Sequence, residues 1–367
     1  MSAQYYQPVY LLIVTVLTYF VCRWYNEKVI GDIGRTKTSH SLLALLLATF
    51  LIWFIGFRPL SGLFVDMANY NNSYMAFYYG NPFSFTWDTE NFLFDNIFSW
   101  FGANLISIEY FFLLIAFIYF GLMLWACWKI FPNDTLLAFL VYLGAFSTFS
   151  YGTNGIKAGA AASIFLLALA YRENKLLAIV LLWISLGFHH SMLAPIVAYI
   201  VASFYRKPKY YLWGWLFCLL LAAGHVTSFM SFFSGFTDEH GAVYLSTDVE
   251  DAVQNVSGFR PDFILYSAVP VFFGYWLMVK KGIESETYNF LWCTYTLTNC
   301  VFLLCTYGSF INRIAYLSWL ILPIVLLYPV VNTSWGKGQQ RYLHYVVYGH
   351  LGFTLFMEII YYGLLNG

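Results

Sequence analysis

The chain has 367 residues, of which 60% are hydrophobic, 22% aromatic and only 10% charged, and its formal net charge is zero. This composition excludes an ordinary soluble domain and a disordered chain, and it is typical of a protein with many membrane spans. Zero net charge gives no reason to expect a nucleic-acid partner.

Apolar segments follow one another along the whole chain. About 12 crossings fit, within a range of about 10 to 13, because each crossing needs roughly 20 apolar residues. We expect them at residues 8–24, 41–57, 107–127, 134–150, 159–171, 176–188, 191–204, 211–226, 262–279, 288–306, 315–331 and 343–364. Because several are short, the pattern also fits broken or half-membrane helices. We predict one all-α, polytopic integral membrane domain over residues 1–367.

Lysine and arginine residues cluster in alternate connections between these segments. The clusters are Arg23, Lys28, Arg35 and Lys37; Lys129; Arg172 and Lys175; Arg206, Lys207 and Lys209; Lys280 and Lys281; and Lys337 and Arg341. Short cytoplasmic connections are rich in such cations, so both termini are predicted on the outer side. The first apolar run precedes its positive charge, which argues against a cleaved signal peptide.

Four cations fall on the outer side of this pattern, and isolated cations there indicate an anionic ligand. They are Arg58, Lys157, Arg260 and Arg313. The predicted outer loops, about 58–106 and 227–261, are acidic instead. Their carboxylates are Asp66, Asp88, Glu90, Asp95, Asp238, Glu239, Asp248, Glu250 and Asp251. We therefore expect the functional surface on the outer face.

The first outer loop is rich in aromatic residues between Tyr70 and Phe101. Tyrosine and tryptophan prefer the membrane interface, so this stretch predicts one or two interfacial helices that anchor the loop. The alternative is a wall on which sugar rings stack. Both roles are compatible for a protein that handles a carbohydrate at the membrane surface.

Cysteine and histidine residues do not form a recognisable site. The six cysteines fall within or at the ends of apolar spans, so we expect packing thiols and no disulfide framework. The histidines show no zinc-ligand spacing. The acidic stretch 248–251 is more typical of a solvated loop than of a divalent-cation site. We predict no metal and no cofactor.

Four short motifs stand at the predicted outer ends of spans. They are Arg58-x7-Asp66-x3-Tyr70, Asn154-Gly155-Ile156-Lys157, Phe188-His189-x-Ser191 and Arg313-Ile314-x-Tyr316. Their order and spacing resemble the EpsG family of bacterial exopolysaccharide proteins, related to Wzy-type polymerases, over about residues 58 to 330. One departure is Lys157-Ala158, where the family pattern usually has Arg followed by Gln. The cation is kept there, but the planar fork of arginine is lost.

The resemblance implies a polymerase of the bacterial inner membrane, with an architecture like that of GT-C glycosyltransferases. Such a protein joins oligosaccharide repeat units carried on undecaprenyl diphosphate, on the outer face of the membrane. The expected partners are this lipid-linked oligosaccharide, membrane lipid and a chain-length regulator. A diphosphate leaving group favours fixed cations, which the four outer cations supply.

The resemblance also suggests roles for individual residues. Substrate binding would fall to the four cations together with Asn154, Tyr70, Tyr74 and Tyr316. The base that accepts the proton of the acceptor hydroxyl would be His189, Asp66 or Glu90. Each has a structural alternative: Asp66 pairs with Arg58, His189 ends a helix, and the tyrosines pack or anchor at the interface.

Two other functions remain open at this level. A single-sugar transferase that uses a polyprenyl-phosphate sugar would differ only in product length. A transporter or flippase for a lipid-linked sugar would also need cations, but such proteins commonly show internal repeats, which we do not find. Glu358 is the main ionisable residue expected inside a span. A sugar O-acyltransferase is a more distant alternative.

Overall fold

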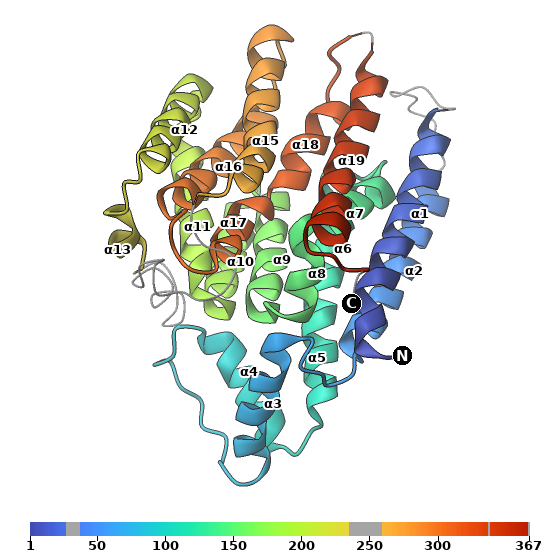
Figure 1. Cartoon of the computed structure of the whole chain (residues 1–367), viewed down its shortest axis with the longest axis vertical. Coiled ribbons are helices and arrows are strands. Elements are labelled where there is room, and N and C mark those ends of the chain that lie inside the picture. Colours follow the sequence, from blue (N-terminus) through green and yellow to red (C-terminus); the bar gives the residue numbers. More distant parts are fainter. Residues whose placement is uncertain (27–36, 235–258, 337, 366–367) are drawn as a thin grey trace. The chain divides into compact units, whose positions relative to one another are not determined.

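The computed structural model describes residues 1–26, 37–234, 259–336 and 338–365, and every regular element in these residues is helical (Figure 1). The predicted class, an all-α polytopic membrane protein, is confirmed. The chain forms two compact units, unit 1 (Met1–His189 and His344–Gly367) and unit 2 (His190–Leu343). Most of the predicted loop 227–261, with its acidic stretch 248–251, lies outside the described residues.

Unit 1 consists of apolar helices joined mostly by short turns. In chain order they are η1 (Ala3–Tyr5), α1 (Tyr6–Asn26), α2 (Lys37–Gly56), α3 (Val65–Tyr78), α4 (Phe92–Ala103), α5 (Ile108–Ala116), the π-helical η2 (Phe117–Gly121), α6 (Leu122–Ile130), α7 (Thr135–Leu143), α8 (Phe146–Thr153), α9 (Ile156–Ala170) and α10 (Lys175–Phe188), with most of α19 (Gln339–Leu355) and the π-helical η5 (Phe356–Tyr361).

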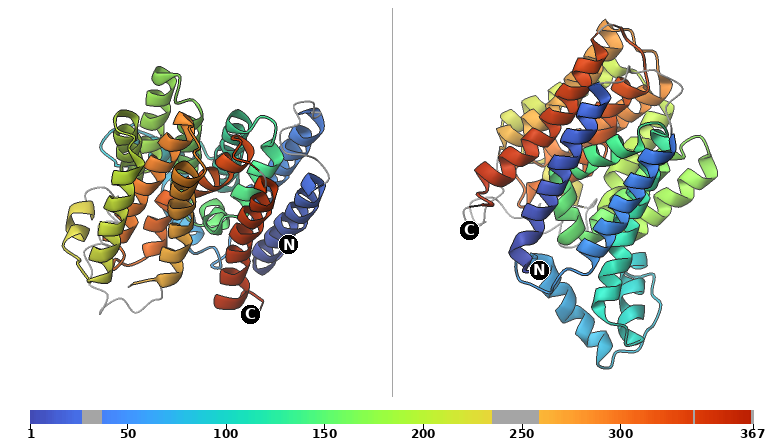
Figure 2. Two further views of the ribbon diagram at one scale, coloured as in Figure 1. Left: turned by 90° about the horizontal axis from the view of Figure 1, so that it is seen from above. Right: turned by 90° about the vertical axis from the view of Figure 1, so that its right-hand side faces the viewer.

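The first and last helices of the chain, α1 and α19, lie side by side in unit 1 (Figure 2). Side-chain hydrogen bonds join Cys22 to Tyr348 and Gln7 to Glu358. The carboxyl group of Glu358 therefore has a polar neighbour on the adjacent helix.

The predicted span 134–150 is wrong as a continuous helix, because α7 and α8 meet at a bend of 75°. A break frees carbonyl groups at the end of α7, which must find other donors in an apolar environment. Side chains supply them: Val141 O contacts His350 Nε2, and Tyr142, Leu143 and Gly144 accept hydrogen bonds from Thr148, Tyr10 and Thr354. These contacts stabilise the break between α7 and α8.

Helix α9 is the core of unit 1 and packs against α5, α6, α8, α10 and η2. All of its residues are buried except Lys157, Ala158 and Ala170. A helix that is apolar on every side belongs in a core, and its many alanines let the surrounding helices approach closely. The two partly exposed positions Lys157 and Ala158 lie in its first turn.

Unit 2 consists of a second set of helices. They are η3 (His190–Met192), α11 (Leu193–Phe204), α12 (Pro208–Ala223), α13 (Phe229–Ser234), α15 (Pro261–Lys280), α16 (Glu286–Leu304), α17 (Ile311–Trp319) and α18 (Leu322–Val331), followed by the start of α19. Helix α16 packs against α11, α12, α15, α17 and α18. It forms the centre of this unit.

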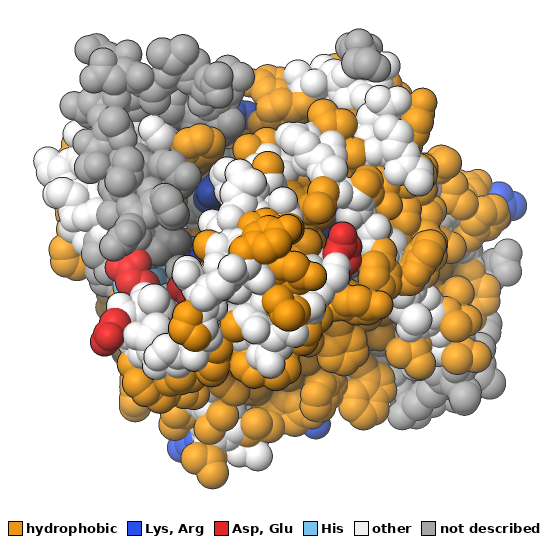
Figure 3. All heavy atoms as spheres, turned by 90° about the horizontal axis from the view of Figure 1, so that it is seen from below, with side chains coloured by type: hydrophobic (Ala, Val, Ile, Leu, Met, Phe, Trp, Pro, Cys, Tyr) orange, Lys and Arg blue, Asp and Glu red, His pale blue; other side chains and the backbone are white. Residues whose placement is uncertain are grey.

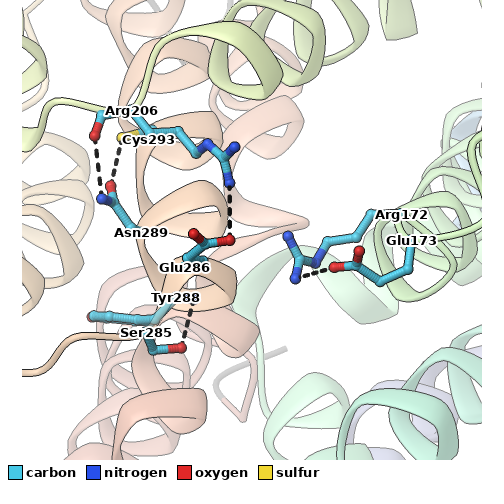
Figure 4. Close-up of polar contacts among 8 residues, drawn as sticks. All are labelled: Arg172, Glu173, Arg206, Ser285, Glu286, Tyr288, Asn289 and Cys293. Atoms are coloured by element: carbon cyan, nitrogen blue, oxygen red, sulfur yellow. Dashed lines mark hydrogen bonds and ion pairs between the residues drawn. The ribbon is translucent and has the colours of Figure 1, made fainter.

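Polar side chains fix the packing of α16. Asn299 accepts from Trp215 Nε1 at 2.7 Å and donates to Ser318 Oγ at 2.9 Å. At the start of the helix, Ser285 Oγ accepts from the backbone N–H of Tyr288, and Asn289 donates to the carbonyl of Arg206 (Figure 4). Buried polar groups that are fully paired specify a single arrangement of neighbouring helices.

Five helical segments in the described residues are long and apolar enough to cross a membrane, and the bent pair α7–α8 raises this number to six. The predicted segments coincide with helices, but several are shorter than a crossing. Helix α9, with 15 residues, is about 22 Å long, whereas the apolar core of a bilayer is about 30 Å thick. The described residues thus contain five to six candidate spans and additional shorter apolar helices, and the predicted count of about 12 spans, some of them short or broken, stays a prediction.

Within unit 1, the connections group as the charge pattern predicts. Lys129 Nζ lies 5.2 Å from the centre of the Tyr171 ring. This contact brings two predicted cytoplasmic connections together. Arg58 contacts Thr153, and this contact brings two predicted outer connections together. The assignment of one end to the cytoplasm stays a prediction.

Candidate functional site

The break between α8 and α9 brings several polar residues of unit 1 to one place. The carbonyl of Ser150 accepts from the N–H groups of Asn154 at 2.8 Å and Gly155 at 3.0 Å, which ends α8. Helix α9 begins directly afterwards. A Cβ atom on Gly159 would lie 2.5 Å from the Tyr151 carbonyl oxygen, so only glycine permits this sharp reversal.

Lys157 occupies the first turn of α9. Its Nζ lies 2.9 Å from Asp95 Oδ1 and 4.9 Å from the centre of the Phe94 ring. The Lys157 and Asp95 side chains are 23% and 31% exposed, so a ligand can reach the pair. Gly155, at the helix N-cap, provides no capping side chain. The N-terminal end of the helix dipole adds to the positive potential around Lys157.

Asp95 is positioned by the close packing of α4 on α10. A Cβ atom on Gly187 would lie 2.8 Å from side-chain atoms of Phe92 and Leu93, so glycine allows the two helices to touch. Sequence reasoning placed Asp95 among the outer carboxylates but not among the site residues. No local signal could have found its role, because its partner Lys157 is 62 residues away.

Arg58 is a buried cation that is only 2% exposed. Its guanidinium donates to the carbonyl oxygens of Ile55 at 2.9 Å and Thr153 at 2.8 Å. The ring centre of Phe112 lies 4.8 Å from its Cζ. In the described part of the chain, no carboxylate lies within ion-pair distance of Arg58. The alternative in which Asp66 pairs with Arg58 is therefore wrong.

The charge of Arg58 survives its burial. Desolvation lowers the pKa of Arg58 to about 10, and the nearby hydroxyl groups of Tyr6 and Tyr70 oppose this shift. Because this pKa is still well above neutrality, the guanidinium stays protonated. A buried charge with no counter-ion is costly, so an anion bound here would be favoured.

Two buried polar atoms near the break have no hydrogen-bond partner among the described residues. They are Arg58 Nε, a donor, and Asn154 Oδ1, an acceptor. Arg58 donates to the residue that directly precedes Asn154. Most buried polar atoms in proteins are paired, so an unpaired donor and an unpaired acceptor on adjoining residues indicate a place for a polar ligand.

The EpsG family model matches residues 41–364. The chain belongs to the EpsG family. Membership makes it a membrane protein of exopolysaccharide biosynthesis. The match covers every site residue predicted from the sequence and confirms the resemblance found there. No curated protein and no solved structure matches the chain.

Phe94 is the centre of this EpsG site. Its ring centre lies 5.9 Å from that of Tyr70 and 6.4 Å from that of Phe188, in addition to its contact with Lys157. Elements α3, α4, α9 and α10 therefore meet at this ring. Two further residues, Arg58 and Asn154, adjoin the start of α9.

The three predicted bases lie on or beside the elements that meet at Phe94. His189 directly follows Phe188 and ends α10, where its N–H donates to Ser185 O at 3.1 Å. Asp66 lies in the first turn of α3, one turn before Tyr70. Glu90 lies exposed, two residues before the start of α4. Which of them accepts a proton stays a prediction.

Tyr74 has a packing role in this EpsG protein. It is fully buried, and its hydroxyl donates to the Ile106 carbonyl at 2.6 Å. This bond ties α3 to the turn before α5. Because both the ring and the hydroxyl are engaged, we leave Tyr74 out of the proposed site.

The remaining predicted residues belong to unit 2. Arg260 Nε donates to Asp262 Oδ1 at 2.9 Å, so this cation has a carboxylate partner. Arg313 lies on α17, with its Cζ 5.3 Å from the centre of the Phe310 ring. Tyr316 is 4% exposed and packs against Trp319. The prediction that all four outer cations share one site stays untested.

The described residues contain no group of three or more His, Cys, Asp or Glu side chains placed to hold a metal ion. All six cysteines are free and buried. The site in unit 1 thus offers a helix N-terminus, two cations, a carboxylate and an amide oxygen. Such a set suits an anionic ligand that also carries hydroxyl groups.

Proposed function

We propose that this EpsG family member is a Wzy-like glycosyltransferase that joins polyprenyl-diphosphate-linked oligosaccharide repeat units into a polysaccharide on the outer face of the bacterial inner membrane. The observation that carries this proposal is the buried, unpaired Arg58 Nε beside the α8–α9 break that displays Lys157. A buried cation without a counter-ion is expensive, and a diphosphate would offset that cost.

The reaction separates charge in a way that suits these cations. The bond between the anomeric carbon of the donor and the phosphate oxygen breaks, and its electron pair leaves with the diphosphate. The acceptor hydroxyl oxygen then bonds to the anomeric carbon, and its proton passes to a base. Fixed cations stabilise the transition state most where the leaving oxygen gains negative charge.

In this proposal Lys157 exchanges one anion for another. Without substrate, Asp95 neutralises Lys157 across 2.9 Å. The incoming diphosphate takes the place of Asp95, and Arg58 Nε supplies a second donor. Asn154 Oδ1 accepts a hydrogen bond from a sugar hydroxyl. The released carboxylate of Asp95 then joins His189, Asp66 and Glu90 as a candidate base.

The test uses the full-length protein in lipid nanodiscs with lipid-linked repeat units extracted from cells that lack this gene. We expect a ladder of products on a gel from wild type. Lys157→Ala should abolish the ladder, whereas Lys129→Ala, which removes an exposed cation at the other end of unit 1, should preserve it. The amount of folded protein is checked for each variant by size-exclusion chromatography.

Other outcomes would replace the proposal. Products extended by a single sugar from a polyprenyl-phosphate donor would establish a single-sugar transferase. Movement of the lipid-linked unit across a vesicle membrane without any product would establish a transporter. A protein partner that regulates chain length is a further prediction, and co-purification from cells that make the polymer would test it.

A further inference from the structure

Four aromatic side chains form an exposed patch at the start of α4, which we name the aromatic patch: Phe85, Trp87, Phe92 and Trp183. Successive ring centres lie 4.9, 4.9 and 5.4 Å apart. Phe85, Trp87 and Trp183 are 50%, 64% and 50% exposed. Hydrophobic side chains dominate the face that carries α3 and α4, with few charges among them (Figure 3).

The segment that carries Trp87 is held in place by Asn96. This buried side chain donates to the carbonyls of Thr86 at 2.7 Å and Phe92 at 2.6 Å, and it accepts from the Thr86 N–H at 3.0 Å. Thr86 Oγ1 in turn donates to Asp88 Oδ2 at 3.2 Å and accepts from the Asp88 N–H at 3.0 Å. An exposed segment with so many internal bonds is organised before any ligand arrives.

The charge of this region does not fit attachment to an acidic membrane surface. No lysine or arginine occurs between residues 59 and 128, whereas carboxylates occur at Asp66, Asp88, Glu90, Asp95 and Glu109. Segments that bind anionic lipid pair apolar or aromatic residues with cations, which this region lacks. Exposed aromatic rings flanked by carboxylates instead match a sugar, whose C–H faces stack on rings and whose hydroxyl groups donate to carboxylates.

The patch also adjoins the cationic site. Phe92 precedes Asp95 by three residues, which corresponds to about 4.5 Å of rise along α4. A ligand with its diphosphate at Lys157 would therefore place its first sugars near Phe92.

We propose that the aromatic patch and Asp88 form a saccharide subsite for the oligosaccharide of the lipid-linked repeat unit. This inference rests on the proposed function for the identity of the ligand. Trp87 and Phe85 stack on the sugar rings, and Asp88 accepts hydrogen bonds from their hydroxyl groups.

The test measures how tightly free oligosaccharides bind, with no glycosyl transfer taking place. Oligosaccharides cut by mild acid from the polysaccharide of the host cell, free of lipid and diphosphate, are titrated into the full-length protein in nanodiscs by calorimetry. Trp87→Ala should weaken binding about tenfold, because one stacking contact is lost. Trp87→Phe should stay within about threefold of wild type, because a ring remains. Trp100→Ala removes another exposed tryptophan of α4 and should have no effect.

The outcomes separate this inference from the proposed function. If Trp87→Ala weakens binding and Lys157→Ala does not, the subsite stands even where no product ladder forms. If wild type does not bind the oligosaccharides, or binds them no better than Trp87→Ala, the subsite is refuted. If Trp87→Ala leaves the titrations unchanged while Trp87→Phe loses part of the tryptophan quenching by brominated lipids, the patch is a membrane anchor and the inference is overturned.

Discussion

The two ends of unit 1 hold their cations in different ways. At one end, Lys129 lies exposed over the Tyr171 ring, and Arg172 pairs with its exposed neighbour Glu173 (Figure 4). At the other end, Arg58 is buried with no carboxylate partner among the described residues, and Lys157 pairs with a residue from a distant helix. Cations whose partners are local and exposed suit a membrane surface. Buried or long-range cations cost stability and indicate a ligand.

The largest fall in activity should come from the end of unit 1 that holds Arg58 and Lys157. Lys157→Ala should lower the rate of product formation by roughly 100-fold or more, because a fixed charge at the leaving group is lost. Lys157→Arg should restore most of the activity and would match the usual family residue. Initial rates with the lipid-linked repeat unit measure both variants. An equal fall in the rate of product formation for Lys129→Ala would show that the two ends of unit 1 do not differ in function.

The second largest fall in activity should come from substitution of Asp95. Asp95→Asn keeps the shape of the side chain but removes its charge, and we expect roughly a tenfold or greater fall in kcat if the freed carboxylate accepts a proton. The unfolding free energy should change by less than about 1 kcal/mol, since the pair with Lys157 is partly exposed. Initial rates with the lipid-linked repeat unit measure the change in kcat. An unchanged rate would leave Asp95 as a neutralising partner only.

The sharp reversal before α9 gives a prediction about stability. Gly159→Ala should destabilise the protein by about 1 to 3 kcal/mol, because its methyl group would meet the Tyr151 carbonyl. Gly349→Ala, on α19, is the matched control, because no atom lies within 4 Å of the position that the new methyl group would take. It should be neutral or slightly stabilising. Thermal unfolding in detergent compares the two, and similar values would contradict the close packing of α8 and α9.

The smallest effect should come from the pair of Arg172 with its exposed neighbour Glu173. Glu173 is 81% exposed, so Glu173→Gln should change the unfolding free energy by less than about 1 kcal/mol. Product formation should stay within about twofold of wild type. The same unfolding and activity assays apply. A large loss of activity would mean that this end also takes part in function.

Arg58 is not expected to set the pH dependence of the reaction. Its pKa is lowered to about 10, so it loses its proton only as the pH rises through that value. Rates at neutral pH should therefore report on the base. A slope of the rate near neutrality would therefore come from a group other than Arg58.

Much of the fold could be predicted from the pattern of apolar segments. The segments expected at 159–171 and 176–188 coincide with α9 and α10, which are apolar helices shorter than a full membrane crossing. The bend between α7 and α8 was missed, because Gly144 and its neighbours resemble an ordinary apolar run. The carbonyl partners that permit the bend come from α1 and α19, far away in the chain.

The candidate site was predicted only in part. The motifs selected Arg58, Asn154 and Lys157, which the structure places around the break between α8 and α9, and their role in binding stays a prediction. They did not reveal that Asp95 pairs with Lys157, or that the Tyr74 hydroxyl donates to the Ile106 carbonyl. Burial and pairing depend on neighbours from other helices, which spacing along the chain does not describe.

The sequence alone determined the membrane class, the helical segments and the family, because hydrophobicity and short motifs are local properties of the chain. Only the tertiary structure decided which charges are neutralised. It buried Arg58 among aromatic rings with an unpaired donor and brought Asp95 to Lys157 across 62 residues. The electrostatic state of a cation depends on its solvation and on the charges that folding brings within a few ångströms.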